Sequence, residues 1–238
     1  MKVNIFIIGT GLIGGSLGLA LKDSPIVNYV YGYDVNKESL KIAQEIGAID
    51  EDVDLITGAS KSDIIFLCSP LSRFQEIIST ITPVLKPNTI ITDVGSTKKE
   101  VMQIFESLPE NIWGIGGHPM AGSEIKGING ADRYLFENAV YVITPGKAPK
   151  EQVDKLIAII KTTGARIKIL DEITHDEIVA TVSHVPHLAA VALVNLTEGN
   201  KDNLIMAAGG FRDTTRIASS NPELWEDILF SNNGPVLN

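Results

Sequence analysis

Short apolar runs alternate with amphipathic stretches through the first two thirds of the chain. The runs have the length of strands buried on both faces, and the stretches between them carry apolar residues at helical spacing. We expect strands at Val3–Ile8, Tyr29–Asp34, Ile64–Cys68, Thr89–Asp93, Trp113–Gly116, Ala139–Thr144 and Arg166–Leu170. We expect helices at Gly14–Lys22, Lys37–Ile46, Phe74–Leu85, Lys98–Leu108 and Lys150–Thr162. This alternation predicts an α/β domain with a mostly parallel, doubly wound sheet, and it leaves open whether the last strands run antiparallel.

The strand pattern stops after Leu170, and the rest of the chain has the pattern of helices only. Asp171–Leu196 is expected to form one long helix, with Asp171 and Thr174 as candidate N-caps. Pro186 is expected to kink it. Interruptions are expected at Gly199–Asn200, at Gly209–Gly210 and at the turn-like run Ser231–Pro235.

This change of pattern divides the chain into two expected domains, residues 1–170 and residues 171–238. The second domain is small for an independent hydrophobic core. We therefore expect it to pack on the first domain, to bury apolar surface against another subunit, or to continue beyond residue 238. Its long apolar helix favours a homodimer formed through the helical domain.

A glycine-rich turn follows the first strand directly and opens the first helix. In the run Gly9-Thr10-Gly11-Leu12-Ile13-Gly14, the first glycine permits a tight turn and the second lets the backbone approach a pyrophosphate. The third lets the helix pack closely on the strand, and the helix N-terminus attracts the phosphates. Asp34, at the end of the next strand, is suited to hold ribose hydroxyls and to repel a 2′-phosphate. These features predict a Rossmann-type domain that binds NAD rather than NADP; a glycine turn that binds nothing is the alternative.

Composition and charge exclude several classes of protein. The chain has 44% hydrophobic residues and a net charge of -9, so a substantial core is expected and nucleic acid would be repelled. The single cysteine, Cys68, excludes an internal disulfide and a multi-cysteine metal site. No apolar stretch approaches the ~20 residues of a membrane span, and the chain starts with a strand rather than a secretory signal. We therefore expect a soluble, cytoplasmic protein that acts on a small molecule.

Small and polar residues follow three neighbouring strands, where an open parallel sheet binds its ligands. Ser69-Pro70 follows one strand, Ser96 lies just after the second, and His118 just after the third. A neutral imidazole is a natural base for an alcohol proton near pH 7, so His118 is the candidate base; a loop histidine bonded to a carbonyl is the alternative. Ser96 could orient that imidazole, or it could cap the following helix, a role also open to Thr97.

The helical region carries two polar clusters. The first is Ser183-His184-Val185-Pro186-His187, whose two histidines share one helix face, but no carboxylate follows at metal-ligand spacing, so we expect no metal. The second contains Arg212 and Arg216, which could bind a substrate carboxylate bidentately. Surface ion pairs, Arg212 with Asp213 or Arg216 with Glu223, are the alternative.

Together these segments resemble the prephenate dehydrogenase family, which includes arogenate dehydrogenases, over essentially the whole chain. The motifs that carry the resemblance are GTGLIGGSLGLAL at the start, Asp93–Lys98, Gly117–Glu124, Ser183–His187 and Phe211–Ala218. The resemblance implies that prephenate and NAD yield 4-hydroxyphenylpyruvate, carbon dioxide and NADH, on the route to tyrosine. Family members usually carry more helices after the point where this chain stops, and those helices help to build a dimer; we still expect a homodimer here, because the long apolar helix Ile178–Leu196 needs a partner surface.

The resemblance also implies roles for individual residues. His118 would take the proton of the ring hydroxyl, Ser96 would orient His118, and Arg216 would bind a substrate carboxylate. The other residues implied at the substrate pocket are His187, Ser183, Ser123, Glu124, Gly209 and Trp225. The residues expected at the cofactor are Gly9, Gly11, Leu12, Ile13, Gly14, Asp34, Ser69 and Pro70.

Three other functions stay open. Arogenate dehydrogenase differs only in an amino group on the substrate, and no residue decides between the two substrates. Another NAD(P)-dependent dehydrogenase of this layout, such as a β-hydroxyacid dehydrogenase or an imine or pyrroline reductase, usually relies on a polar group of the long helix. The absence of a lysine between Asp171 and Asn200 counts against the lysine-dependent ones. A cofactor-binding regulator without catalysis would need only the glycine turn and Asp34.

Overall fold

A computed structural model describes residues 2–123, 125–199 and 201–238. The described residues form two compact units, one up to Glu172 and one from Ile173 onward. The first unit contains an eight-stranded sheet with the strand order β3-β2-β1-β4-β5-β6-β7-β8. The strands are β1 (Val3–Ile8), β2 (Val27–Tyr33), β3 (Glu51–Asp52), β4 (Ile64–Leu67), β5 (Ile90–Asp93), β6 (Trp113–Pro119), β7 (Val140–Thr144) and β8 (Arg166–Ile169).

The expected mostly parallel sheet is confirmed. Neighbouring strands from β3 to β6 are parallel, β6 and β7 are antiparallel, and β8 is parallel to β7. The chain order reverses direction between β1 and β4, which is the switch point at which doubly wound sheets bind ligands. The apolar pattern does not predict β3 or the short helix α3 (Leu55–Lys61), because neither is long enough to show a period.

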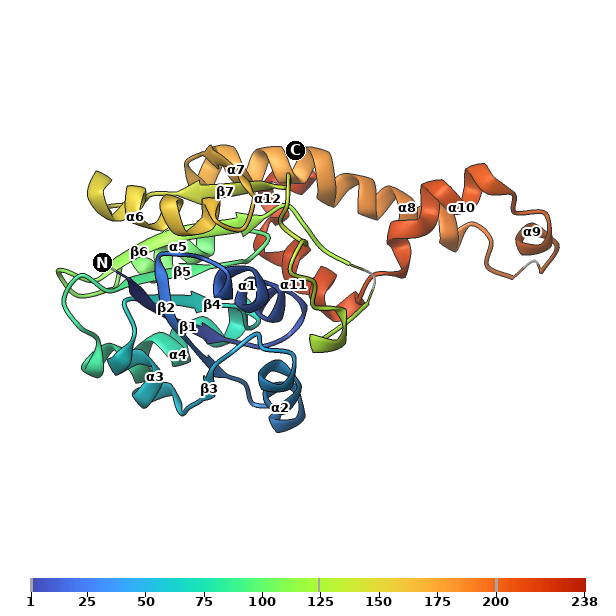
Figure 1. Ribbon diagram of the computed structural model, residues 1–238. Coiled ribbons are helices and arrows are strands. Elements are labelled where there is room, and N and C mark those ends of the chain that lie inside the picture. The colour runs from blue at the N-terminus through green and yellow to red at the C-terminus, as the bar shows by residue number, and fades with distance from the viewer. Residues whose placement is uncertain (1, 124, 200) are drawn as a thin grey trace. The chain divides into compact units, whose positions relative to one another are not determined.

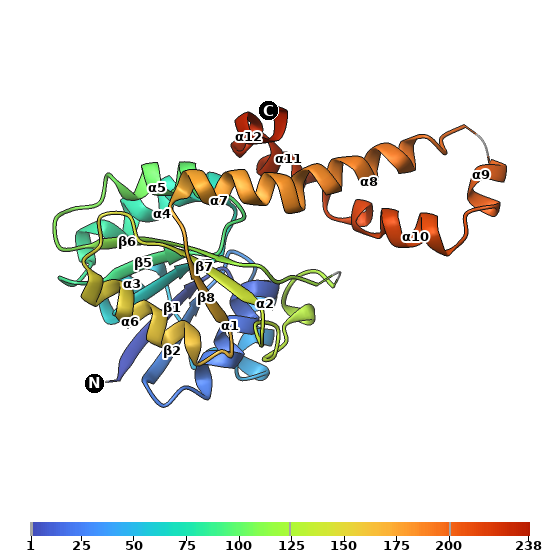
Figure 2. The same cartoon turned by 90° about the horizontal axis from the view of Figure 1, so that it is seen from above.

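Helices cover both faces of the sheet (Figure 1). Figure 2 shows α1 and α6 on one side of the strands and α4 and α5 on the other. Besides α3, the helices of this unit are α1 (Leu12–Lys22), α2 (Lys37–Glu45), α4 (Phe74–Ile81), α5 (Lys99–Phe105) and α6 (Lys150–Lys161). Short 3-10 turns lie at Leu71–Arg73, Thr82–Val84 and Ile128–Gly130.

The continuous apolar strands build a separate hydrophobic core on each face, because successive side chains of a strand point to opposite sides. In β1, Ile5 and Ile7 belong to the core that includes residues of α1, α2 and α6. Phe6 and Ile8 belong to the core that includes residues of α3, α4 and α5. All four side chains are essentially inaccessible to solvent. The sheet is therefore buried on both faces, and its strand ends are left as the place for a site.

The second unit contains only helices in its described part. They are α7 (Glu172–Val179, which begins at the last residue of the first unit), a π-helical turn (Ala180–His184), α8 (Val185–Asn195), α9 (Lys201–Ile205), α10 (Gly209–Thr215), a 3-10 turn (Arg216–Ser219), α11 (Pro222–Ser231) and α12 (Asn233–Leu237). The run Ser231–Pro235 is not simply a turn, because Asn233 starts α12 and Pro235 falls in its first turn, where proline is tolerated.

The expected long helix is present, but its irregularity takes the form of a π turn that precedes Pro186. Pro186 has no N–H to donate to the carbonyl of Val182, four residues earlier, and its ring crowds that carbonyl. Val182 lies inside the π-helical turn Ala180–His184. The wider turn therefore absorbs the proline within a continuous helix.

The expectation that no apolar stretch approaches the length of a membrane span is wrong. Among the described residues, the helix Glu172–Asn195 is long and apolar enough to cross a membrane. The core helix of a soluble protein passes the same test. In this helix the polar residues His175, Asp176, His184 and His187 are buried, whereas only 28% of its apolar window is buried.

Gly14→Ala is expected to lower the free energy of unfolding by about 1–3 kcal/mol, the usual cost of adding volume to a packed site. The new methyl carbon would lie 1.9 Å from the carbonyl oxygen of Gly9. Urea titrations followed by circular dichroism measure the change. Gly122→Ala is the control, because nothing lies within 4 Å of a methyl group there. Equal losses in the two variants would contradict the close packing of α1 on the turn.

Candidate active site

The glycine turn connects β1 to α1 at the carboxyl edge of the sheet. Gly9 has φ +103°, and a Cβ there would lie 2.6 Å from the carbonyl oxygen of Cys68. Gly14 packs against Gly9 as described above. A Cβ on Gly11, in contrast, would have no atom within 4 Å. Gly9 and Gly14 thus serve the protein's own packing, whereas the space beside Gly11 is open to a ligand.

Asp34 ties the end of β2 to this turn. Its Oδ2 accepts hydrogen bonds from the backbone N–H of Thr10 at 2.7 Å and from the Thr10 hydroxyl at 3.2 Å. Its Oδ1 accepts from the backbone N–H of Asn36 at 2.8 Å. The carboxylate is half-buried, so it retains an exposed part with which to meet ribose hydroxyls.

The remaining residues expected at the cofactor lie beside this turn. Leu12 and Ile13 form the first turn of α1, and Ser69 and Pro70 follow β4, the neighbour of β1. The hydroxyl oxygen of Ser69 is buried and has no hydrogen-bond partner within the described chain. A buried hydroxyl without a partner is costly, and a bound polar group would satisfy it. Together with the open side of Gly11, this hydroxyl fits a dinucleotide.

His118 lies within β6, and not in a loop after it as the apolar pattern predicts. The strand continues to Pro119 because Gly116–Pro119 pair antiparallel with β7, where His118 lies opposite Val142. The residue is 8% exposed. A strand fixes the backbone of His118 more firmly than a loop would, as a positioned base requires.

Ser96 lies in the loop between β5 and α5 and is half-buried. It is not the cap of the following helix: the N-cap position of α5 is Lys98, and no side chain caps it. Ser123 lies in the exposed loop after β6, where its hydroxyl accepts a hydrogen bond from the backbone N–H of Ile125 at 3.2 Å. Glu124, which the resemblance puts at the rim of the substrate pocket, lies outside the described residues.

A buried ion pair joins Asp93, the last residue of β5, to Lys98, at the N-cap position of α5. Sequence reasoning quotes both only as part of a motif and misses their contact. The sequence does contain an indication of this pair: Asp93 is a charged residue at the end of an apolar strand, and Lys98, of opposite charge, follows five positions later.

In the second unit, Trp225 brings two histidines of the long helix together. The His187 ring stacks on the Trp225 ring at 3.5 Å between centroids and 1° between planes. His184 meets the same ring edge-on at 5.9 Å. Both imidazoles are buried, and burial lowers the pKa of His184 to about 4 and also lowers the pKa of His187. Both side chains are therefore neutral near pH 7.

Asn232 fixes His184 from another part of the same unit. Its Nδ2 lies 3.0 Å from Nδ1 of His184 and donates to the carbonyl of Asp176 at 2.8 Å. Asp176 in turn bonds the neighbouring His175 at 2.7 Å. In the described chain no three His, Cys, Asp or Glu side chains are grouped to hold a metal. The pair His184 and His187 is thus engaged with Asn232 and Trp225.

The other expected substrate residues of this unit lie on the long helix itself or on elements that pack on α8. Ser183 is half-buried, one helical turn before it. The 3-10 turn that begins at Arg216 packs on α8, the helix that carries His187. Nδ1 of His187 is buried and has no hydrogen-bond partner in the described chain. Gly209 starts α10, which also packs on α8. The unit therefore gathers His187, Trp225 and the backbone at Arg216.

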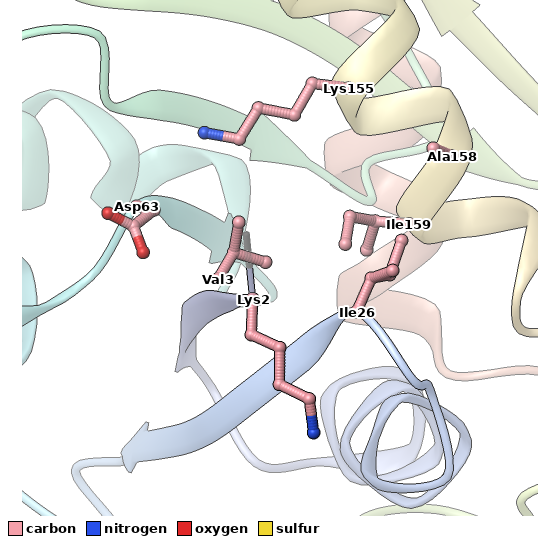
Figure 3. Close-up of a pocket in the computed structure, with 7 residues that line it drawn as sticks. All are labelled: Lys2, Val3, Ile26, Asp63, Lys155, Ala158 and Ile159. Atoms are coloured by element: carbon pink, nitrogen blue, oxygen red, sulfur yellow. The ribbon is translucent and has the colours of Figure 1, made fainter.

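A pocket at the amino-terminal edge of the sheet takes no part in this site (Figure 3). Figure 3 shows the Lys155 side chain extending toward Asp63, while the Lys2 side chain points away from it. None of the expected site residues lines the pocket. Its lining is Lys2, Val3, Ile26, Asp63, Lys155, Ala158 and Ile159.

Comparison with known proteins covers both units. A family model described as prephenate dehydrogenase, nucleotide-binding domain, matches residues 17–169. A second, described as prephenate dehydrogenase, dimerization domain, matches residues 171–238. The chain belongs to the prephenate dehydrogenase family. The family-level resemblance found in the sequence is thereby confirmed.

Individual members of the prephenate dehydrogenase family align along the whole chain. The prephenate dehydrogenase of Bacillus subtilis (strain 168) is 38% identical over 246 residues, covering 100% of this chain and 66% of that relative. The chain thus spans about two thirds of that relative's length.

Two solved structures of family members have the same fold. The A. aeolicus prephenate dehydrogenase, in complex with hydroxyphenyl propionate and NAD+, has a TM-score of 0.89 at 33% identity, covering 100% of this chain and 85% of that chain. Synechocystis arogenate dehydrogenase has a TM-score of 0.82 at 33% identity, covering 98% of this chain and 85% of that chain.

The burial of His184 predicts a loss of stability in acid. Its pKa in the folded chain is lowered to about 4, whereas an unfolded histidine has a pKa near 6.5, so the unfolded state binds the proton first. The contribution of His184 to stability is complete above about pH 6.5 and declines as the pH falls toward about 4. Calorimetry should show a smaller decline of the unfolding temperature over this range in His184→Gln than in the wild type. Identical declines would contradict the prediction.

Proposed function

We propose that this chain catalyses the NAD-dependent oxidative decarboxylation of prephenate to 4-hydroxyphenylpyruvate. The observation that carries the proposal is the buried His118 on β6, at the same sheet edge as the glycine turn with its open Gly11. The family membership and the NAD+ in the A. aeolicus structure support it. The half-buried Asp34 favours NAD over NADP, because a carboxylate repels a 2′-phosphate.

His118 is the proposed base, and Ser96 the residue that orients it. When bound, NAD supplies the acceptor for the hydride that leaves the ring carbon bearing the hydroxyl. Neutral His118 takes the proton of that hydroxyl, so no positive charge builds up on the oxygen. The bond to the ring carboxylate breaks, carbon dioxide leaves, and the electron pair of that bond completes the aromatic ring. Aromatisation makes the overall step strongly downhill.

The second unit is proposed to bind the substrate and to dimerise. Arg216 is the proposed partner of a substrate carboxylate, since a guanidinium binds a carboxylate bidentately. The partnerless Nδ1 of His187 is suited to a polar group of the substrate, and Ser183 and Trp225 lie beside it. We propose a homodimer through this unit, in which exposed apolar side chains of the long helix, such as Val182 and Leu188, become buried. The proposed location is the cytoplasm.

Arogenate is the second candidate substrate. The Synechocystis arogenate dehydrogenase is as similar in sequence to this chain, at 33% identity, as the A. aeolicus enzyme is. The two substrates differ at the side chain, away from the ring carbon that is oxidised, so the same base would serve both.

Incubation with NAD and prephenate is expected to form NADH and to release carbon dioxide in equal amounts. Absorbance at the NADH band and trapped carbon dioxide measure the two products. The same assay with arogenate gives the substrate preference as a ratio of kcat/KM. NAD binding without NADH formation from either substrate would instead support a regulator without catalysis.

His118→Asn is expected to reduce kcat by about two to four orders of magnitude, the usual contribution of a positioned base. The asparagine is polar and similar in size, so the dissociation constant for NAD should stay nearly unchanged. Steady-state kinetics and a fluorescence titration with NADH measure the two quantities. Near-normal turnover in the variant would remove His118 from the mechanism.

A further inference from the structure

The end of β5 holds a fully buried pair of opposite charges. Neither Asp93 nor Lys98 has side-chain area exposed to solvent, and Nζ of Lys98 contacts Oδ2 of Asp93. Removing two charges from water carries a desolvation cost that their attraction often does not recover, so a buried ion pair is weak support for stability alone. This pair therefore calls for a role beyond holding the fold together.

The Asp93 carboxylate joins the two segments that carry the proposed catalytic residues. Its Oδ2 accepts a hydrogen bond from the backbone N–H of Gly95 at 2.7 Å, directly before Ser96. Its Oδ1 accepts from the backbone N–H of Gly117 at 2.9 Å, directly before His118. One side chain thus sets the distance between the Ser96 loop and the His118 strand.

Three glycines make room for the pair. A Cβ on Gly95 would lie 2.8 Å from Oδ2 of Asp93, and one on Gly117 would lie 2.4 Å from the carbonyl oxygen of Asp93. A Cβ on Gly116 would lie 3.0 Å from Cδ of Lys98. The glycines before Ser96 and before His118 therefore let the backbone close on the two charges, and the lysine stem runs along the strand that carries His118.

Two further titratable groups lie near Asp93, and both are uncharged near pH 7. They are the Cys68 thiol, just after β4, and the Tyr141 phenol of β7. Burial and the negative charge of Asp93 raise the pKa of both groups. Lys98 therefore contributes a positive charge that offsets Asp93 at this end of the sheet.

We infer that Asp93 and Lys98 are positioning residues, which hold Ser96 and His118 in register and whose opposite charges offset each other beside the strand that carries the imidazole. The catalytic part of this inference rests on the proposed role of His118. The charge balance does not, because it concerns the imidazole whether or not prephenate is the substrate.

The test follows the titration of His118 by NMR in the full chain labelled at histidine Cε1. The chain has four histidines, so four signals are expected, and His118→Asn identifies one of them. Asp93→Asn removes the negative charge of the pair, which should move the His118 midpoint down by about 0.5–1 pH unit. Lys98→Met removes the positive charge of the pair and should move the midpoint up by a similar amount. The double variant should restore the midpoint to near its wild-type value.

Kinetics then separate positioning from charge. In Lys98→Met and in the double variant we expect kcat to fall about 10-fold or more while NADH affinity stays within about 3-fold, because the glycine turn is untouched. Lys98→Arg, which keeps the charge, should recover part of the loss. The control is the exposed pair Lys150 and Asp154 on α6, whose removal by Lys150→Met and Asp154→Asn should change neither the midpoint nor kcat.

Midpoints that stay in place, or that move in the same direction in the two single variants, would overturn the inference. Should Asp93→Asn not fold, Lys98→Met decides alone, and a midpoint that does not rise overturns it. Opposite shifts in a protein that forms no NADH would support the charge balance and refute the proposed function. An enzyme that forms NADH but whose His118 midpoint does not move in these variants would support the proposed function and refute the charge balance.

Discussion

Two aspartates at the carboxyl edge of the sheet, Asp34 and Asp93, accept hydrogen bonds from backbone N–H groups of neighbouring segments. Asp34 accepts from Thr10 and Asn36, and Asp93 accepts from Gly95 and Gly117. Each carboxylate therefore joins segments that are distant in the chain. The geometry of the proposed cofactor and base positions depends on these bonds, because turns without such anchors would be free to shift.

The two aspartates differ in exposure, and the difference suits their proposed roles. Asp34 is half-buried at the end of β2 and can meet a ligand while it holds the glycine turn. Asp93 is fully buried and needs a counter-charge, which Lys98 provides. The same chemical group thus serves recognition at one strand end and internal positioning at another, and the surrounding burial decides which.

In the second unit, a long apolar helix bears the polar residues proposed to bind the substrate. The π-helical turn accommodates Pro186, and the adjoining histidines are kept neutral by burial against Trp225. Exposed apolar side chains on the same helix, such as Val182 and Leu188, offer a surface for a second copy of the chain. Substrate chemistry and dimerisation are therefore proposed for one helix.

The sequence by itself determined the α/β class, the parallel sheet, the glycine turn and the family, because these follow from local periodicity and from short motifs. Only the tertiary structure decided that His118 lies inside a strand, since antiparallel pairing with β7 extends β6 past its apolar run. Tertiary structure alone also joined Asn232 to His184 and closed Asp93 on Gly117. Such contacts link residues many positions apart, and no local pattern encodes a distance that is set by packing.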